Sequence, residues 1–313
     1  MNTQSIMKRI GHFNLKKITN YIVMLAVIIA VVTTWFWYFN IYMNQERRFW
    51  SAINTSMSTP SAVRTLQEGA SGNQVVQKYR FFYSPEKVFQ NKVAYTERDA
   101  TTNTFVETEG IVYYPQNQYL RYTSFESRQD SEAAVNIDEL LGVWAEQNPM
   151  QQEQTPEQEE QDKLNYQSEL VTLAIFGNFD ARFRNELMND LKNSEAYGDV
   201  SFALEDKNED GEDILNYSVT VKLKPYVTAL NKAFERSGYD AFPPLDPSNY
   251  EDDATVPATF TVRKKDTTIT NINFGGRSEA YSNYGVAFTP ERPEATLTVQ
   301  ELQQRVQSVV QDL

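Results

Sequence analysis

The sequence contains no cysteine and only one histidine, His12, among its 313 residues. The absence of cysteine excludes disulfides, thiolate metal ligands, cysteine nucleophiles and cysteine-ligated iron–sulfur clusters. A single histidine cannot supply a site with several histidine ligands, and it almost excludes a histidine-based catalytic triad. The G-x-S-x-G, Walker A and G-x-G-x-x-G motifs are also missing. The sequence therefore gives no indication of an α/β-hydrolase, a P-loop NTPase or a dinucleotide-binding enzyme.

Positive charge is also scarce. The chain has 29 Lys and Arg against 42 Asp and Glu, which gives a net charge of −13. Nucleic-acid binding requires a basic surface, so no nucleic-acid partner is expected. The many carboxylates leave a carboxylate-based hydrolase open as an alternative, but they identify no catalytic pair.

One long apolar run dominates the N-terminal region. Residues 18–45 carry no charge, and the 19 residues Tyr21–Phe39 are almost wholly apolar. This is close to the ~20 residues that a helix needs to cross ~30 Å of hydrocarbon. The run ends in aromatic residues, which favour the membrane interface. We therefore predict an uncleaved signal anchor at 18–45, with a cleaved signal peptide as the alternative.

Charge on the two sides of this run predicts its orientation. Four basic and no acidic residues precede it, namely Lys8, Arg9, Lys16 and Lys17, so residues after 45 carry −17 (−13 minus 4). By the positive-inside rule, residues 1–17 form a cytoplasmic basic tail and the C-terminal bulk lies outside the cytoplasm. The absence of cysteine from so large an external region favours a bacterial cell envelope.

Residues 61–126 contain strand-forming segments separated by polar turns such as Ser71-Gly72-Asn73 and Ser84-Pro85. Their spacing of about a dozen residues indicates an antiparallel meander, not parallel β-α-β units. The predicted strands are 61–70, 75–83, 87–98, 104–114 and 119–126.

Helical patterns follow the meander. Ile137–Gln147 and Leu164–Phe176 are each predicted to form a helix, and Asp180 is the predicted N-cap of a third. Between the first two, residues 146–162 are rich in Gln and Glu and contain no branched aliphatic or aromatic side chain. This segment cannot bury enough apolar surface to offset ordering, so a flexible loop is predicted there.

A second group of strands and helices completes the chain. A hairpin is predicted at 200–204 and 214–223, a helix at 225–238, and further strands at 259–263, 267–274 and 278–281. Residues 296–313 are predicted to form an amphipathic helix with a capping box of Thr298 and Glu301. This helix either docks on its own domain or, through 298–313, meets a partner helix. The element order predicts an α+β fold, in which a transmembrane helix precedes an external domain with a curved antiparallel sheet packed on helices.

The acidic segment Asp206–Gly211, DKNEDG, fits the start of a calcium loop. In that loop the side chains of Asp206, Asn208 and Asp210 would supply oxygen ligands. However, position twelve is Tyr217 instead of glutamate, and the flanking residues are predicted strands. A solvated hairpin turn, in which Gly211 supplies the positive φ, is the alternative. No other cofactor and no catalytic residue is predicted.

Two stretches carry a family resemblance. The first runs from Phe49–Met57 into the aromatic runs YRFFYS (79–84), IVYYP (111–115) and YLRYTSF (119–125). The second is TFTVRKKDTTITNINFGG (259–276) followed by AYSNYGVAFTPERPE (280–294). Together they resemble the LolA/LppX-like envelope lipoproteins, which implies a half-open antiparallel barrel around helices, with an apolar cavity for lipid. Those proteins are soluble or tethered by a lipidated cysteine, whereas this chain has an apolar run and no cysteine. The segment 146–162 also falls outside the pattern.

These observations predict a single-pass membrane protein whose external part comprises an α+β domain at 46–295 and the C-terminal helix. The predicted function is non-enzymatic and includes binding of a lipid or another apolar ligand. The 18 Phe and 18 Tyr would suit a cavity wall, although the same rings could fill an ordinary core. The main alternative is a scaffold or assembly component of an envelope complex.

Overall fold

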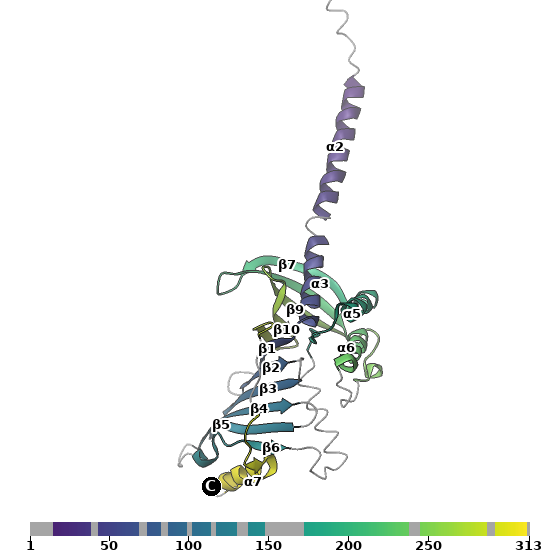
Figure 1. Cartoon of the computed structure of the whole chain (residues 1–313). Coiled ribbons are helices and arrows are strands. Elements are labelled where there is room, and N and C mark those ends of the chain that lie inside the picture. Colours follow the sequence, from purple (N-terminus) through teal and green to yellow (C-terminus); the bar gives the residue numbers. More distant parts are fainter. Residues whose placement is uncertain are drawn as a thin grey trace, which may run out of the picture. The chain divides into compact units, whose positions relative to one another are not determined.

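The computed structural model describes residues 15–38, 43–68, 74–82, 87–98, 102–113, 117–129, 137–147, 172–237, 245–286 and 292–311. These residues form five α-helices and one curved 12-stranded sheet, which confirms the α+β class (Figure 1). They fall into two compact units that divide after Trp50. Most of the predicted tail (1–14) and most of the predicted loop (148–162) lie outside the described residues.

The first unit contains helix α2 (Leu15–Trp37) and the start of helix α3 (Met43–Met57). Large apolar side chains of α2 are exposed along its length, from Ile22 (62%) to Trp35 (64%). In the described part of the chain, no helix combines the length and the hydropathy of a membrane-spanning segment.

The sheet belongs to the second unit and consists of two meanders of consecutive strands. The first meander is β1 (Ser61–Glu68), β2 (Gln74–Phe82), β3 (Val88–Arg98), β4 (Thr102–Tyr113), β5 (Asn117–Gln129) and β6 (Ala145–Gln147). The second meander is β7 (Tyr197–Lys207), β8 (Asp213–Lys222), β9 (Thr255–Arg263), β10 (Thr268–Phe274) and β11 (Arg277–Ser282).

The two meanders are joined by a single antiparallel seam between β1 and β11, which runs from the pair Val63–Ser282 to the pair Gln67–Ser278. All other neighbouring strands are antiparallel too, except that β12 (Leu297–Thr298) pairs in parallel with β6. Side chains alternate between the two faces of each strand. We call the face that carries Arg64 and Phe260 the inner face, and the face that carries Val63 and Thr259 the outer face.

On the inner face of the second meander, helices α5 (Ala181–Asn193) and α6 (Leu223–Ser237) cover the strands (Figure 1). Tyr197 of β7 contacts both Tyr226 of α6 and Phe260 of β9, with ring centroids 5.6 and 5.9 Å apart. The carboxylate of Asp180 accepts hydrogen bonds from the backbone of Arg182 and Phe183, which confirms the predicted N-cap. This half of the inner face is therefore a conventional sheet-on-helix core.

The outer face of the second meander carries a row of polar, uncharged side chains that runs across the strands. Cross-strand pairing aligns Ser201, Ser218, Thr259, Asn273, Ser278 and Gln67 on six neighbouring strands. None of these side chains is buried. The alternation of apolar inner and polar outer positions is typical of an antiparallel sheet with one solvated face.

Part of the outer face of the first meander is buried instead. Val88, Ile111, Tyr113 and Tyr119 form a small core, against which Trp144 and Ala295 pack. The chain then forms β12 and helix α7 (Val299–Gln311) beside β6, where Leu302 (0% exposed) and Val306 (7%) are buried.

The predicted capping box of α7 is present. The backbone nitrogen of Thr298 donates to Oε2 of Glu301 over 2.8 Å, and the backbone nitrogen of Glu301 donates to Oγ1 of Thr298 over 3.1 Å. The apolar side of α7 thus lies against its own domain.

Two helix predictions are wrong. Residues 137–147 form a short 3-10 helix at Asp138–Leu140 and strand β6, not an amphipathic helix. Of the helix predicted at 164–176, residues 164–171 lie outside the described residues, and 172–176 have no helical structure. Leu173, Ala174, Ile175 and Phe176 are buried in a segment without regular secondary structure, so tertiary burial decides the conformation of this apolar run.

Candidate functional site

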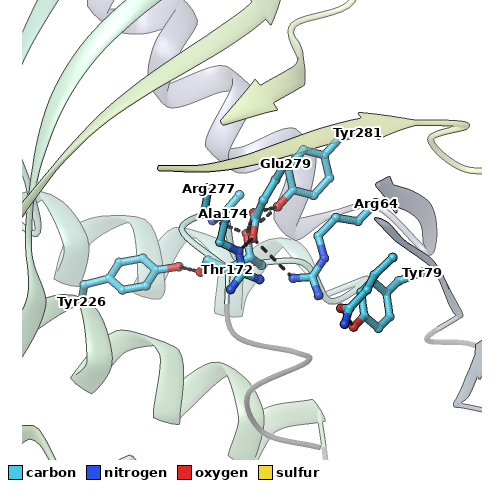
Figure 2. Close-up of polar contacts among 9 residues, drawn as sticks. Arg64, Tyr79, Thr172, Ala174, Tyr226, Arg277, Glu279 and Tyr281 are labelled. Atoms are coloured by element: carbon cyan, nitrogen blue, oxygen red, sulfur yellow. Dashed lines mark hydrogen bonds and ion pairs between the residues drawn. The ribbon is translucent and has the colours of Figure 1, made fainter. Parts of the chain in front are cut away.

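A cluster of buried polar side chains lies on the inner face at the seam between the meanders (Figure 2). Arg64 of β1 and Glu279 of β11 are both 0% exposed, and Nη1 of Arg64 lies 3.8 Å from Oε1 of Glu279. Nε of Arg277 lies 3.0 Å from the same oxygen. Since an ion pair out of contact with water requires near-complete hydrogen bonding to be tolerated, the remaining partners of Glu279 are decisive.

Those partners come from β11 and from the segment at 172–176. The hydroxyls of Thr172 and Tyr281 donate to Oε2 of Glu279 over 2.8 and 2.5 Å. From α6, the hydroxyl of Tyr226 donates to the carbonyl of Thr172 over 2.6 Å. Burial, followed by the negative charge of Glu279, raises the pKa of Tyr281 well above its usual value. Burial raises the pKa of Tyr226 as well, so both phenols stay protonated and able to donate.

Aromatic rings enclose the cluster. The guanidinium carbon of Arg64 lies 4.5 Å from the ring centroid of Tyr79 and 5.5 Å from that of Phe81. Phe176 stacks on Phe81 and on Tyr281, with centroids 6.5 and 5.1 Å apart. The cluster thus fastens β1, β11, α6 and residues 172–176 together. Because Arg64 and Glu279 are completely buried, neither can contact a substrate in this conformation, and we call the cluster the seam clamp.

The inner face continues beyond the seam clamp over β2–β5 with a different character. Six apolar or aromatic side chains there are half-buried: Val93, Tyr95, Val106, Val112, Leu120 and Tyr122. Pairing places them in adjacent rows, for example Tyr95 opposite Val106. Burial raises the pKa of the Tyr122 phenol, which indicates low-dielectric surroundings. We call this surface the inner apolar face.

Two residues interrupt the inner apolar face. Gly110 lies in the middle of β4, and the residue opposite it on β3 is Asn91. Oδ1 of Asn91 is buried and has no hydrogen-bond partner in the described structure. Neither residue was singled out from the sequence, because an Asn and a Gly within strands carry no signal of their own until pairing brings them together.

Two open depressions occur elsewhere on the described surface. One, of about 440 Å³, lies between α5 and α6 and is crossed by the ion pair of Lys232 with Asp190. The other, of about 360 Å³, lies on the polar outer face around Ser218 and Thr259. Neither brings together charged or nucleophilic groups in an arrangement that would support catalysis.

The three residues of the candidate calcium loop lie in the β7–β8 hairpin. Oδ1 of Asp206 accepts from the backbone nitrogen of Lys207, and Oδ1 of Asn208 accepts from that of Glu212, each over 2.8 Å. Gly211 has a φ of 78°, as the hairpin alternative expects. Among the residues that the structure describes, no group of three or more His, Cys, Asp or Glu side chains could hold a metal ion. Calcium binding here stays a prediction.

Comparisons of the chain with protein-family models, with curated proteins and with solved structures gave no match. The geometry of the inner apolar face, together with the sequence, is therefore what supports a function.

Proposed function

We propose that this protein is a membrane-anchored, extracytoplasmic binding protein of the cell envelope that holds a lipid or another apolar ligand on the inner apolar face. The observation that carries the proposal is that β3–β5 bear apolar side chains on both faces of the sheet. Their outer face forms a closed core with Trp144 and Ala295, whereas their inner face has side chains that are only half-buried.

The contrast with the second meander strengthens this argument. There, inner-face residues such as Phe260, Val262 and Ile272 are 0% exposed. A soluble domain rarely leaves a contiguous apolar surface accessible unless that surface binds something. Ligand pockets are typically apolar with a small number of polar groups. The inner apolar face has this composition, with Asn91 and Thr108 among apolar neighbours.

The anchor is part of the same proposal. The uncharged segment 18–45 and the exposed apolar side chains of α2 support insertion into a bilayer. The basic residues before this segment and the acidic chain after it support a cytoplasmic N-terminus and an external domain. The resemblance to LolA/LppX-like proteins agrees with an apolar ligand, and it remains a prediction.

The proposal is tested with the full chain reconstituted in lipid nanodiscs and exposed to an uncharged probe, the methyl ester of a fatty acid that carries a photoreactive diazirine. Crosslinked peptides identified by mass spectrometry are expected from β3–β5, at inner-face positions. Val93→Arg places a charge on the inner apolar face, so it should lower the yield at these positions by about tenfold or more.

Ala94→Arg is the matched control, because Ala94 is the next residue of β3 and lies on the outer face opposite Glu107. It should leave the yield within about twofold of the unmodified chain, a range that corresponds to less than ~0.5 kcal/mol. Labelling confined to α2, or an equal loss in both variants, would contradict a ligand on the inner apolar face.

The alternative function is a scaffold component that acts through the C-terminal helix. Its apolar residues Leu302 and Val306 are already buried on the domain. The exposed residues of α7 are polar, including Gln300, Gln304 and Arg305. Crosslinking of neighbours in intact cells, with and without residues 298–313, separates the two: an unchanged set of partners counts against the scaffold.

A further inference from the structure

The middle of β4 has an unusual residue for a strand interior. Glycine weakens a strand, and its presence there often marks a place where a ligand or another backbone approaches closely. Gly110 pairs with Asn91 on one side and Leu120 on the other. A Cβ added at Gly110 would meet, among the described residues, only the backbone oxygens of Tyr119 at 3.7 Å and Asn91 at 4.0 Å. Neighbouring described side chains therefore do not fill the space above Gly110.

Asn91 borders this space, because directly opposed residues of an antiparallel pair lie side by side on the same face. Oδ1 of Asn91 is buried and lacks a hydrogen-bond partner in the part of the chain that the structure describes. Leaving a buried acceptor without a donor is unfavourable, so such groups are rare in native proteins. A bound molecule with a donor at this position would remove that cost.

Charge is absent around the same place. The inner-face positions from Phe89 to Tyr95 on β3, from Val106 to Val112 on β4 and from Gln118 to Tyr122 on β5 hold no ionisable side chain except the phenols of Tyr95 and Tyr122. A charged headgroup would lack a counter-ion here, and burying an unpaired charge is strongly unfavourable. The carbonyl of an ester, or an ionised carboxylate, has no proton to donate to Oδ1.

We propose that Asn91 and the space above Gly110 form a subsite for a neutral hydrogen-bond donor, a hydroxyl or an amide N–H, on an amphipathic ligand. The donor bonds to Oδ1 of Asn91, while the ligand's acyl or alkyl chain lies along Val93, Val106 and Leu120. This inference rests on the proposed function and specifies the ligand class of the same site.

The experiment uses the full chain in nanodiscs and measures how well two ligands compete with the uncharged diazirine methyl ester. Dodecanamide and methyl dodecanoate share one acyl chain, but only the amide has N–H donors. On the unmodified chain, the amide should compete about fivefold better than the ester, since one buried hydrogen bond contributes roughly 0.5–1.5 kcal/mol. Asn91→Leu should abolish this preference while the ester competes as well as before or better. Ala94→Leu, on the outer face of the same strand, should retain it.

A second variant tests the space itself. Gly110→Val places a strand-favouring side chain where the nearest described atoms are at ordinary contact distance, so it should fold with an unchanged or higher melting temperature. It should also weaken competition by the amide about tenfold or more, because the added side chain occupies the subsite.

The outcomes distinguish the two proposals. If Asn91→Leu keeps the preference for the amide, or Gly110→Val binds the amide as before, the subsite is wrong while the apolar site stands. If neither the amide nor the ester competes on the unmodified chain, both the subsite and the proposed function are overturned.

Discussion

In the second meander, the sheet has one apolar face covered by α5 and α6 and one polar face lined by residues such as Ser218 and Thr259. In the first meander, β3–β5 carry apolar side chains on both faces, and those of the outer face form a tightly buried core around Ile111 and Tyr119. Both meanders are antiparallel and belong to one sheet, so strand pairing cannot account for the difference. The contrast teaches that the covering helices, and not the pairing of the strands, decide how deeply an inner face is buried, and the proposed function rests on this difference.

The largest expected effect is at the seam clamp, which joins the two meanders. Glu279→Leu removes the carboxylate and leaves the buried Arg64 guanidinium without its counter-ion, so the free energy of unfolding should fall by about 3–5 kcal/mol. Replacing Arg64 with Met in the same chain should recover part of the loss, because no uncompensated charge is then buried. Denaturant unfolding of the full chain in detergent micelles, followed by circular dichroism, measures both values.

The exposed ion pair between Lys224 and Asp252 serves as the control for the seam clamp. Asp252→Ala should change stability little, since both side chains are well exposed to solvent. Equal effects of Glu279→Leu and Asp252→Ala would show that the seam clamp does not hold the meanders together.

A second prediction compares the two halves of the inner face by replacing one apolar side chain in each with alanine. Ile272→Ala in the second meander opens a cavity at a completely buried position and should destabilise the chain by about 2–5 kcal/mol. Leu120→Ala in the first meander removes a half-buried side chain, so it should cost roughly 1 kcal/mol. Denaturant unfolding of the two variants measures both losses in the free energy of unfolding. A larger loss for Leu120→Ala than for Ile272→Ala would contradict the difference between the two halves.

The smallest effect concerns pH and the outer face of the first meander. Burial raises the pKa of Glu109, but hydrogen bonds from Arg121 and Gln90 outweigh it, and the pKa lies below its usual value. Because the pKa is lower in the folded state, Glu109 stabilises the fold above the usual carboxyl range. This contribution is lost as the pH falls through the folded-state pKa.

Glu109→Gln should therefore flatten the acid limb of the stability curve. Melting temperatures measured from neutral to acidic pH test this, with Glu139→Gln as an exposed control on the same meander. If the melting temperature of Glu109→Gln falls with acidification as steeply as that of the unmodified chain, another carboxylate controls the loss of stability in acid.

Much of the secondary structure follows from local sequence. Except for β6, the strands of both meanders were predicted from turn signals and β-branched or aromatic residues, and most of their bounds agree within a few residues. The caps at Asp180 and Thr298 were predicted because capping depends on residues within one turn. The segment 172–176 was not, since a short apolar run is compatible with either a helix or a buried extended chain.

The contacts of the seam clamp could not be predicted from the sequence, because they join residues that are far apart along the chain. Thr172 and Glu279 are 107 residues apart and meet only because the segment at 172–176 packs against β11, and nothing in either local sequence indicates the other. Arg64 does leave a signal, since it is a charged residue between Ala62 and Leu66 at the inward positions of β1. Gly110 and Asn91 leave none, because their relation is a matter of register between β3 and β4.

The seam has a consequence for how the protein is made. The hairpins of the first meander form from neighbouring segments, but β1 can find β11 only when nearly the whole chain has left the ribosome. At ordinary synthesis rates this delay is on the order of tens of seconds. During that time the backbone of β1 is an open strand edge, the kind of surface on which chains aggregate. The free edge of β1 is therefore the surface of the nascent chain that stays unpaired until β11 emerges.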